Sequence, residues 1–211
     1  MNPTSSRAQD PFTTLRGIAR RRDAVEHCDM CGSALTPEHQ HLVEPAARKL
    51  VCACDACSIL FPGGAGTKYK RVPRRVRWLN DFAITDGQWD SLMIPIGMAF
   101  FLKSSIENRV LAFYPSPAGP TESLLSLETW NDIVQDNPVL NDMELDVEAF
   151  LVNRLDGPPQ YFVAPIDKCY ELVGLIRARW RGLSGGTEVW QEIRGFSDGL
   201  KQRDRRGAAN A

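Results

Sequence analysis

Long hydrophobic runs are scarce in this 211-residue sequence. The longest nearly continuous one is Leu92–Leu102, and its eleven residues are interrupted by Pro95 and Gly97. A helix needs about 20 apolar residues to cross a bilayer. Residues 1–26 also hold no apolar run of the kind found in a secretory signal. We therefore expect a cytoplasmic protein with no membrane insertion.

Several motifs of common catalytic sites are missing as well. The sequence has no Walker loop, no H-E-x-x-H and no G-x-G-x-x-G. Its composition, 43% apolar and 24% charged, is that of an ordinary globular protein and excludes collagen, coiled coil and wholesale disorder. These features favour a binding or structural role over catalysis.

Cysteine, by contrast, is concentrated in one region. Five of the six cysteines lie within thirty residues, and only Cys169 stands apart, where we expect it to pack in the core. Without a secretory signal, thiols stay reduced, so a cluster predicts a metal or redox site rather than disulfides. The clustered cysteines are Cys28, Cys31, Cys52, Cys54 and Cys57.

Four of these cysteines have the spacing of a tetrathiolate metal site. Cys28 and Cys31 form one C-x2-C pair, and Cys54 and Cys57 form a second pair after 22 residues. Two residues between thiols let one tight turn aim both sulfurs at one ion, at about 2.3 Å for zinc. With expected strands at 50–52 and 59–61 on either side of the second pair, the pattern predicts a zinc-ribbon or rubredoxin-like module.

The spacing alone allows zinc or a single iron, because both accept four thiolates in a tetrahedron. The second pair, CDACS, lacks the Pro and Gly typical of rubredoxin, which favours zinc. Cys52 is an additional thiol with two interpretations, a buried core residue or a fifth thiol that exchanges as a ligand. Its spacing from Cys54 on a strand predicts the same side of the sheet. His27, His39 and His41 lie nearby, and we expect them at the surface.

Charge divides the chain into two unlike parts. Residues 1–80 carry thirteen Lys and Arg against seven Asp and Glu, a net +6, whereas residues 81–211 carry twelve against nineteen, a net −7. Such a shift indicates a domain boundary. We expect a flexible leader at 1–24, a metal-binding module at 25–62, a Gly-rich and basic connector at 63–77, an α+β domain at 78–206 and a tail at 207–211.

Hydrophobic periodicity in the second part indicates strands followed by helices. Strands are expected at 109–114, 147–155 and 161–166. Helices are expected from Thr121 or Ser123 to Val134, from Asp167 and from Thr187. This order predicts an α+β fold with a mainly antiparallel sheet and C-terminal helices.

The connector carries a basic patch that suits a docking surface. Two observations argue against a nucleic-acid role. The overall isoelectric point is near 6.3, and acidic side chains of the second part can form ion pairs with the basic patch. The patch comprises Lys68, Lys70, Arg71, Arg74, Arg75 and Arg77.

Between Glu26 and Arg206, several stretches resemble an uncharacterised bacterial family. Its genes lie among those for the actinobacterial-type, oxygen-tolerant nickel–iron uptake hydrogenase and its maturation proteins. The resemblance includes the four cysteines of the two C-x2-C pairs. It implies a role in the hydrogenase system but assigns no catalytic activity. The stretches are HLVEPAARKLVCACDACSILF, YKRVPRRVRWLNDF, IPIGMAFFLKSS, RVLAFYPSPAGPTESLL, DVEAFLVNR, PIDKCYELVGLIR and WRGLSGGTEVWQEI.

The resemblance and the closed metal site together predict a non-enzymatic accessory protein for hydrogenase maturation or assembly. Its partner would be a hydrogenase subunit or a maturation factor. A rubredoxin-like one-electron carrier with a single iron is the alternative. A zinc-ribbon module that binds nucleic acid is the third hypothesis.

Overall fold

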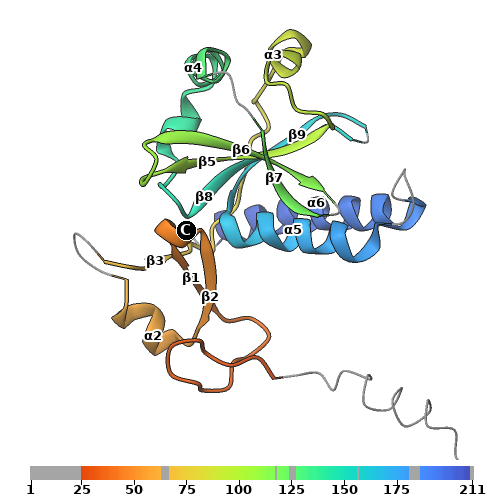
Figure 1. Ribbon diagram of the computed structural model, residues 1–211. Coiled ribbons are helices and arrows are strands. Elements are labelled where there is room, and N and C mark those ends of the chain that lie inside the picture. Colours follow the sequence, from red (N-terminus) through yellow and green to blue (C-terminus); the bar gives the residue numbers. More distant parts are fainter. Residues whose placement is uncertain are drawn as a thin grey trace, which may run out of the picture.

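The computed structural model describes residues 25–62, 67–116, 118–123, 127–155, 157–180 and 186–209 (Figure 1). The chain has the predicted α+β fold, with a small antiparallel sheet beside the cysteines and a larger antiparallel sheet with helices. The expected leader at 1–24 lies outside the described residues. Most of the expected tail belongs to the last helix, which continues to Ala209.

The small sheet has the strand order β2-β1-β3, from β1 (Gln40–Glu44), β2 (Lys49–Ala53) and β3 (Lys70–Arg71). A short 3-10 turn, η1 (Pro45–Ala47), joins β1 to β2, and His41 lies opposite Cys52 in the hairpin. Helix α2 (Asp55–Leu60) begins within the second cysteine pair, with Cys54 as its N-cap and Cys57 in its first turn. Residues 59–61 therefore do not form the expected strand, because Cys54 caps a helix that begins at Asp55 and Ile59 and Leu60 lie within it.

The large sheet has the strand order β4-β9-β8-β5-β6-β7, and every neighbouring pair is antiparallel. This matches the predicted sheet type. Its strands are β4 (Arg77–Trp78), β5 (Met98–Ser104), β6 (Arg109–Ser116), β7 (Gly119–Ser123), β8 (Glu148–Asn153) and β9 (Gln160–Pro165).

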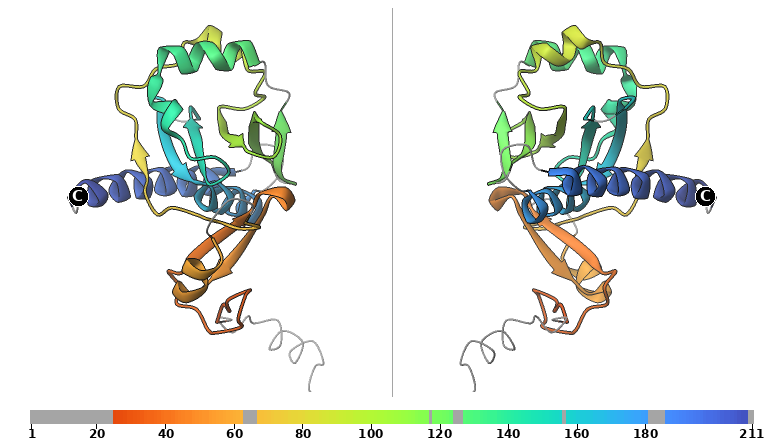
Figure 2. Two further views of the ribbon diagram at one scale, coloured as in Figure 1. Left: turned by 90° about the vertical axis from the view of Figure 1, so that its left-hand side faces the viewer. Right: turned by 90° about the vertical axis from the view of Figure 1, so that its right-hand side faces the viewer.

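Helices cover both faces of the large sheet (Figure 2). On one face, α3 (Asp86–Ser91) and α4 (Leu127–Asp136), followed by the 3-10 helix η2 (Pro138–Asp142), pack on side chains such as Phe101. On the other face, α5 (Ile166–Arg179) and α6 (Gly186–Ala209) pack on side chains such as Phe100. Successive residues of β5 thus contribute to opposite layers, because side chains alternate along a strand.

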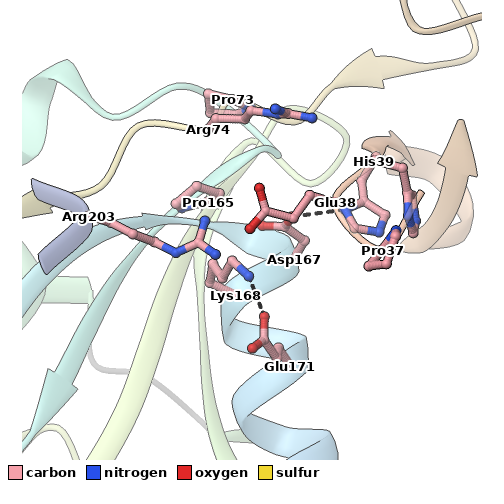
Figure 3. A pocket seen from close by; sticks show the side chains of 11 residues that line it. Pro37, Glu38, His39, Pro73, Arg74, Pro165, Asp167, Lys168, Glu171 and Arg203 are labelled. Atoms are coloured by element: carbon pink, nitrogen blue, oxygen red, sulfur yellow. Dashed lines mark hydrogen bonds and ion pairs between the residues drawn. The ribbon is translucent and has the colours of Figure 1, made fainter. Parts of the chain in front are cut away.

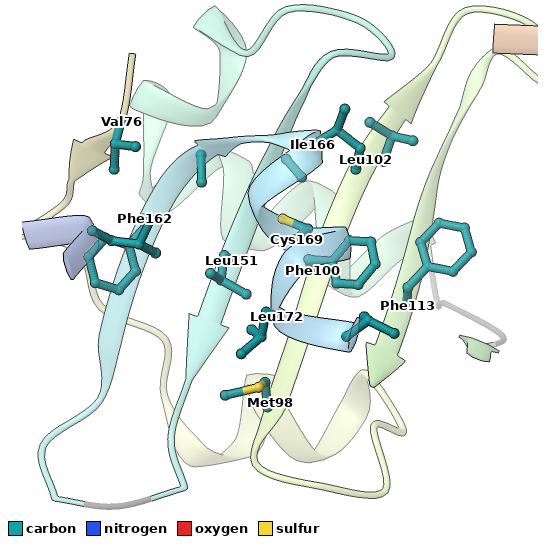
Figure 4. Packing of buried hydrophobic residues seen from close by; sticks show 14 of the residues in the cluster. Val76, Met98, Phe100, Leu102, Phe113, Leu151, Phe162, Ile166, Cys169 and Leu172 are labelled. Atoms are coloured by element: carbon teal, nitrogen blue, oxygen red, sulfur yellow. The ribbon is translucent and has the colours of Figure 1, made fainter. Parts of the chain in front are cut away.

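The core beneath α5 also receives side chains from the small sheet. Phe100, Leu151 and Phe162 meet Cys169 and Leu172 of α5 (Figure 4). Cys169 is fully buried, as expected, and burial raises the pKa of its thiol. Val43 of β1 and Val72, just after β3, belong to the same cluster. The cysteine module is therefore packed against the large sheet through apolar contacts.

Two segments differ from the sequence-based expectation. Thr121 and Ser123 lie in β7 rather than at the start of a helix, because the Pro/Gly turn after β6 closes a hairpin and Gly119 has a φ of 122°. Helix α4 is described from Leu127 to Asp136. The expected connector at 63–77 contributes β3 to the small sheet. Its last residue, Arg77, begins β4, which belongs to the large sheet.

Candidate metal centre

The four cysteines predicted as metal ligands converge on one position. The Sγ atoms of Cys28, Cys31, Cys54 and Cys57 all lie within 4.8 Å of one another, and those of Cys31 and Cys54 are 3.8 Å apart. Cys28 and Cys57 are buried, whereas Cys31 is exposed. Four thiolates at this spacing could hold one metal ion and would fill all four positions of a tetrahedral site.

The first pair lies on a tight knuckle that backbone hydrogen bonds close. The amide of Gly32 donates to the carbonyl of Cys28, and the amide of Cys28 donates to the carbonyl of Ser33, both at 2.8 Å. Gly32 has a φ of 76°, a conformation that glycine adopts without a Cβ penalty. The knuckle therefore favours glycine directly after Cys31.

The second pair lies at the start of α2. Cys54 is the N-cap residue, and its Sγ accepts the backbone N–H of Cys57 at 3.5 Å. The same helical turn brings Cys57 back toward the first knuckle. The second pair thus lies on the first turn of a helix rather than between two strands, and this turn still orients both sulfurs toward one position.

Local hydrogen bonds prepare most of these thiols for metal binding. Ser33 lowers the pKa of Cys31, and the Cys57 amide lowers that of Cys54. Burial opposes ionisation of Cys28, but backbone amides lower its pKa below the usual range. Burial and the three neighbouring thiols raise the pKa of Cys57 to about 12. A bound cation would offset this repulsion and displace the remaining proton, so the site's chemistry fits a metal ion.

The knuckle is tied to the small sheet by a reciprocal pair of hydrogen bonds. The Asp29 amide donates to the Cys52 carbonyl at 2.9 Å, and the Cys52 amide donates to Asp29 Oδ2 at 2.6 Å. Leu42, Val51 and Ala53 form a small core with the buried cysteines. One face of the hairpin therefore supports the four-cysteine group.

Cys52 does not join that group. Strand β2 ends at Ala53, so the alternation that predicted a common side for Cys52 and Cys54 stops before Cys54. Cys52 alternates with Val51 and Ala53 and so belongs to the other face of the hairpin, where its thiol lies beside His39 and His41. Burial and the nearby carboxylate of Asp29 raise the pKa of the Cys52 thiol.

The histidines are also placed differently from one another. His27 is exposed, as expected, and bridges to Ala34 beside the first knuckle. His39 is not a surface residue, because only 6% of its side chain is exposed. His41 is partly buried and contacts Asp167 of α5. The H-x-H spacing was the available signal for this second cluster, but nothing nearby in sequence pointed to Asp167.

Most basic side chains of the connector pair with carboxylates of the same chain. Lys70 lies 2.5 Å from Asp146, and Arg75 and Arg77 approach the fully buried Glu148 at 3.2 and 3.9 Å. Lys68 lies 3.4 Å from Glu44. The remaining two members of the patch, Arg71 and Arg74, have exposed side chains. Much of the basic connector thus neutralises the acidic domain.

The described residues form a small module, whose four cysteines cluster as in a metal-binding module, packed on an antiparallel α+β domain. The chain belongs to the family described as "Family of unknown function (DUF5947)", which it matches over residues 27–204. No curated protein and no solved structure matches it. None of the helices in the described ranges is long and apolar enough to cross a membrane.

Proposed function

We propose that this protein is a non-enzymatic accessory factor for the maturation or assembly of a nickel–iron hydrogenase, with a structural zinc ion held by Cys28, Cys31, Cys54 and Cys57. The observation that supports a structural site is the convergence of all four thiols on one position. A complete set of four thiolates has no open position for substrate. The hydrogenase as partner rests on the resemblance of the sequence.

A protein-docking role is supported by apolar side chains beside the metal ligands. Ile59, Leu60 and Phe61 follow Cys57 after the buried Ser58 and are exposed, Leu60 to 77%. Exposed apolar clusters of this kind mark protein contact sites. The proposed occupant is a hydrogenase subunit or maturation factor.

A deletion strain tests this function. Hydrogenase activity should be lost because the large subunit stays immature, and full activity without the gene would contradict the proposal. Complementation with Leu60→Asp should restore little activity if α2 is the docking surface. Met93→Asp is the matched control, because Met93 is similarly exposed and lies two residues after α3, a helix at the opposite end of the molecule from α2 (Figure 1).

A rubredoxin-like electron carrier remains the second candidate, because four thiolates also suit a single iron. Elemental analysis and a visible spectrum of anaerobically purified protein separate the two. Zinc and no colour support the structural site. A red protein with one iron that bleaches on reduction would contradict the structural zinc site and support the electron carrier.

The nucleic-acid hypothesis is the weakest of the three. The ion pairs of Lys70, Arg75 and Arg77 with buried carboxylates leave less positive charge for phosphates. A nucleic-acid module should be retained on DNA or RNA at low salt and released steeply as salt rises. Absence of retention at low salt would remove this hypothesis.

A further inference from the structure

A second group of metal-ligating side chains lies on the hairpin face opposite the four cysteines. The ligand atoms of His39, His41 and Cys52 all lie within 4.8 Å of one another, and none of the three belongs to the four-cysteine group. We propose that these residues form a second metal site for a divalent transition-metal ion of the zinc type. Imidazole and thiolate ligands together suit such borderline-soft ions.

Strand geometry places the three ligands together. His41 lies in β1 and His39 immediately precedes this strand, and the two imidazole rings are in contact, with their centroids 4.7 Å apart. Cys52 of β2 lies directly opposite His41 in the antiparallel register. Directly opposed residues have Cβ atoms about 5 Å apart, which lets both side chains reach one ion.

Each imidazole is oriented by an acceptor at its Nδ1 atom. His39 Nδ1 lies 3.0 Å from the Thr36 carbonyl, and His41 Nδ1 lies 2.9 Å from Asp167 Oδ2. Because carbonyl and carboxylate oxygens only accept, both Nδ1 atoms carry the proton. In the neutral rings, both Nε2 atoms are then lone-pair donors. Metal-binding histidines are held in this way by carboxylates and carbonyls.

The Nε2 atom of His39 gives independent evidence for a ligand. It is buried and has no hydrogen-bond partner in the described part of the chain. An unsatisfied buried polar atom is destabilising, so native proteins rarely leave one. Coordination to a metal ion would satisfy this lone pair.

The second site differs from the four-cysteine site in having an open coordination position. Three protein ligands leave a fourth position for water in a tetrahedral site. His39 and His41 also line a cavity of about 360 Å³, together with Asp167, Arg74 and Arg203 (Figure 3). The two imidazoles therefore lie in the wall of this cavity.

The site also spans the two parts of the protein. Its ligands come from the small sheet, whereas Asp167, which orients His41, lies in the first turn of α5. A bound ion would therefore stabilise the packing of the cysteine module on the α+β domain.

Metal stoichiometry of the full-length protein tests the proposal. Protein purified without chelator and dialysed against a zinc buffer should hold two zinc ions per chain by native mass spectrometry. His41→Gln and Cys52→Ser should each hold one. His27→Gln is the matched control and should keep two, because His27 lies outside the cluster.

Asp167→Asn provides a milder test that keeps all three ligands. Loss of an orienting carboxylate weakens metal binding by about 10–100-fold, so the second zinc should dissociate at lower competitor concentration. One zinc per wild-type chain, or two in both His41→Gln and Cys52→Ser, would overturn the second site. Neither result would affect the four-cysteine site, which accounts for the first ion.

Discussion

Glu148 is fully buried, and its two carboxylate oxygens face Arg75 and Arg77 of the connector. Its Oε2 also accepts the Glu144 amide at 3.0 Å. A buried carboxylate needs such partners because an unpaired charge in the interior is strongly destabilising. Arg75 and Arg77, which the sequence predicts as members of a docking patch, thus have a structural role as partners of Glu148.

Replacing one of these arginines tests that role. Arg77→Met leaves part of the Glu148 charge uncompensated and should lower the free energy of unfolding by about 2 kcal/mol. Urea denaturation measures the change. Arg71→Met, at an exposed position in the same connector, should stay within about 0.5 kcal/mol of the wild type. Adding Glu148→Gln to Arg77→Met should recover part of the loss, and equal effects of Arg71→Met and Arg77→Met would contradict the assignment.

At the scale of elements, Asp146 joins the connector strand to the large sheet. Its Oδ2 accepts from Lys70 of β3 at 2.5 Å and from the Ser105 hydroxyl at 2.6 Å, and its Oδ1 accepts the Ser105 amide. Burial alone would raise the pKa of Asp146, but these donors hold it below its usual value. One carboxylate therefore links β3, the β5–β6 turn and the turn before β8.

This pKa shift predicts an acid-sensitive contribution to stability. An aspartate carboxyl in the unfolded chain has a pKa of about 3.9, and the folded pKa of Asp146 is lower. The contribution of Asp146 to stability is therefore complete above the unfolded pKa. It is lost as pH falls through the folded pKa. Asp146→Asn should destabilise the protein most near neutral pH, and the difference should shrink in urea titrations below about pH 4. A difference that does not change with pH would contradict the ion pair.

Regular elements with strong periodicity were predictable from the sequence. Strands β6, β8 and β9 and the two C-terminal helices lie where alternation and helical spacing place them. Helix α3 went unpredicted, although Thr85 and Gln88 form a capping box that the sequence contains. Segments such as 59–61 and 121–123 carry signals for two structures, and the hydrogen bonds of Cys54 and the β6 pairing decide between them.

The two metal groups differ in how far apart their parts lie in the sequence. The four-cysteine site was predictable because each C-x2-C pair is formed by a local turn. The three side chains of the second group also lie close together in the sequence, but Asp167, whose carboxylate contacts His41, is 126 residues away from it. Spacing patterns cannot reveal such a contact, because only the packing of α5 against the hairpin creates it.

At the scale of the whole molecule, the cysteine module and the α+β domain have different sources of stability. The module's own core is small and centred on the cysteines, whereas the large sheet has an extensive core on each face. Small metal modules draw much of their folding free energy from the ion. Of the described module residues, Val43 belongs to the core of the large sheet and Leu50 packs against that core.

Loss of one ligand should therefore affect the two parts unequally. Cys54→Ser should release the metal and expose the amides of residues 25–62 to hydrogen exchange, while the 78–206 domain stays protected. Mass spectrometry of exchanged peptides measures both. Cys169→Ser leaves the metal ligands intact, and the 25–62 peptides should keep their protection. Simultaneous loss of protection in both parts of Cys54→Ser would show a single cooperative unit.

The β1–β2 hairpin has a consequence for tolerated sequence change. Its two faces carry different chemistry, with Leu42 and Val51 toward the four cysteines and His41 and Cys52 toward α5. A slip of one residue in strand pairing turns every side chain to the opposite face. A single-residue insertion within β1 would thus place apolar side chains where the imidazoles lie and an imidazole in the small core. The packing of the small core on one face and the group of His39, His41 and Cys52 on the other therefore both constrain the length of β1.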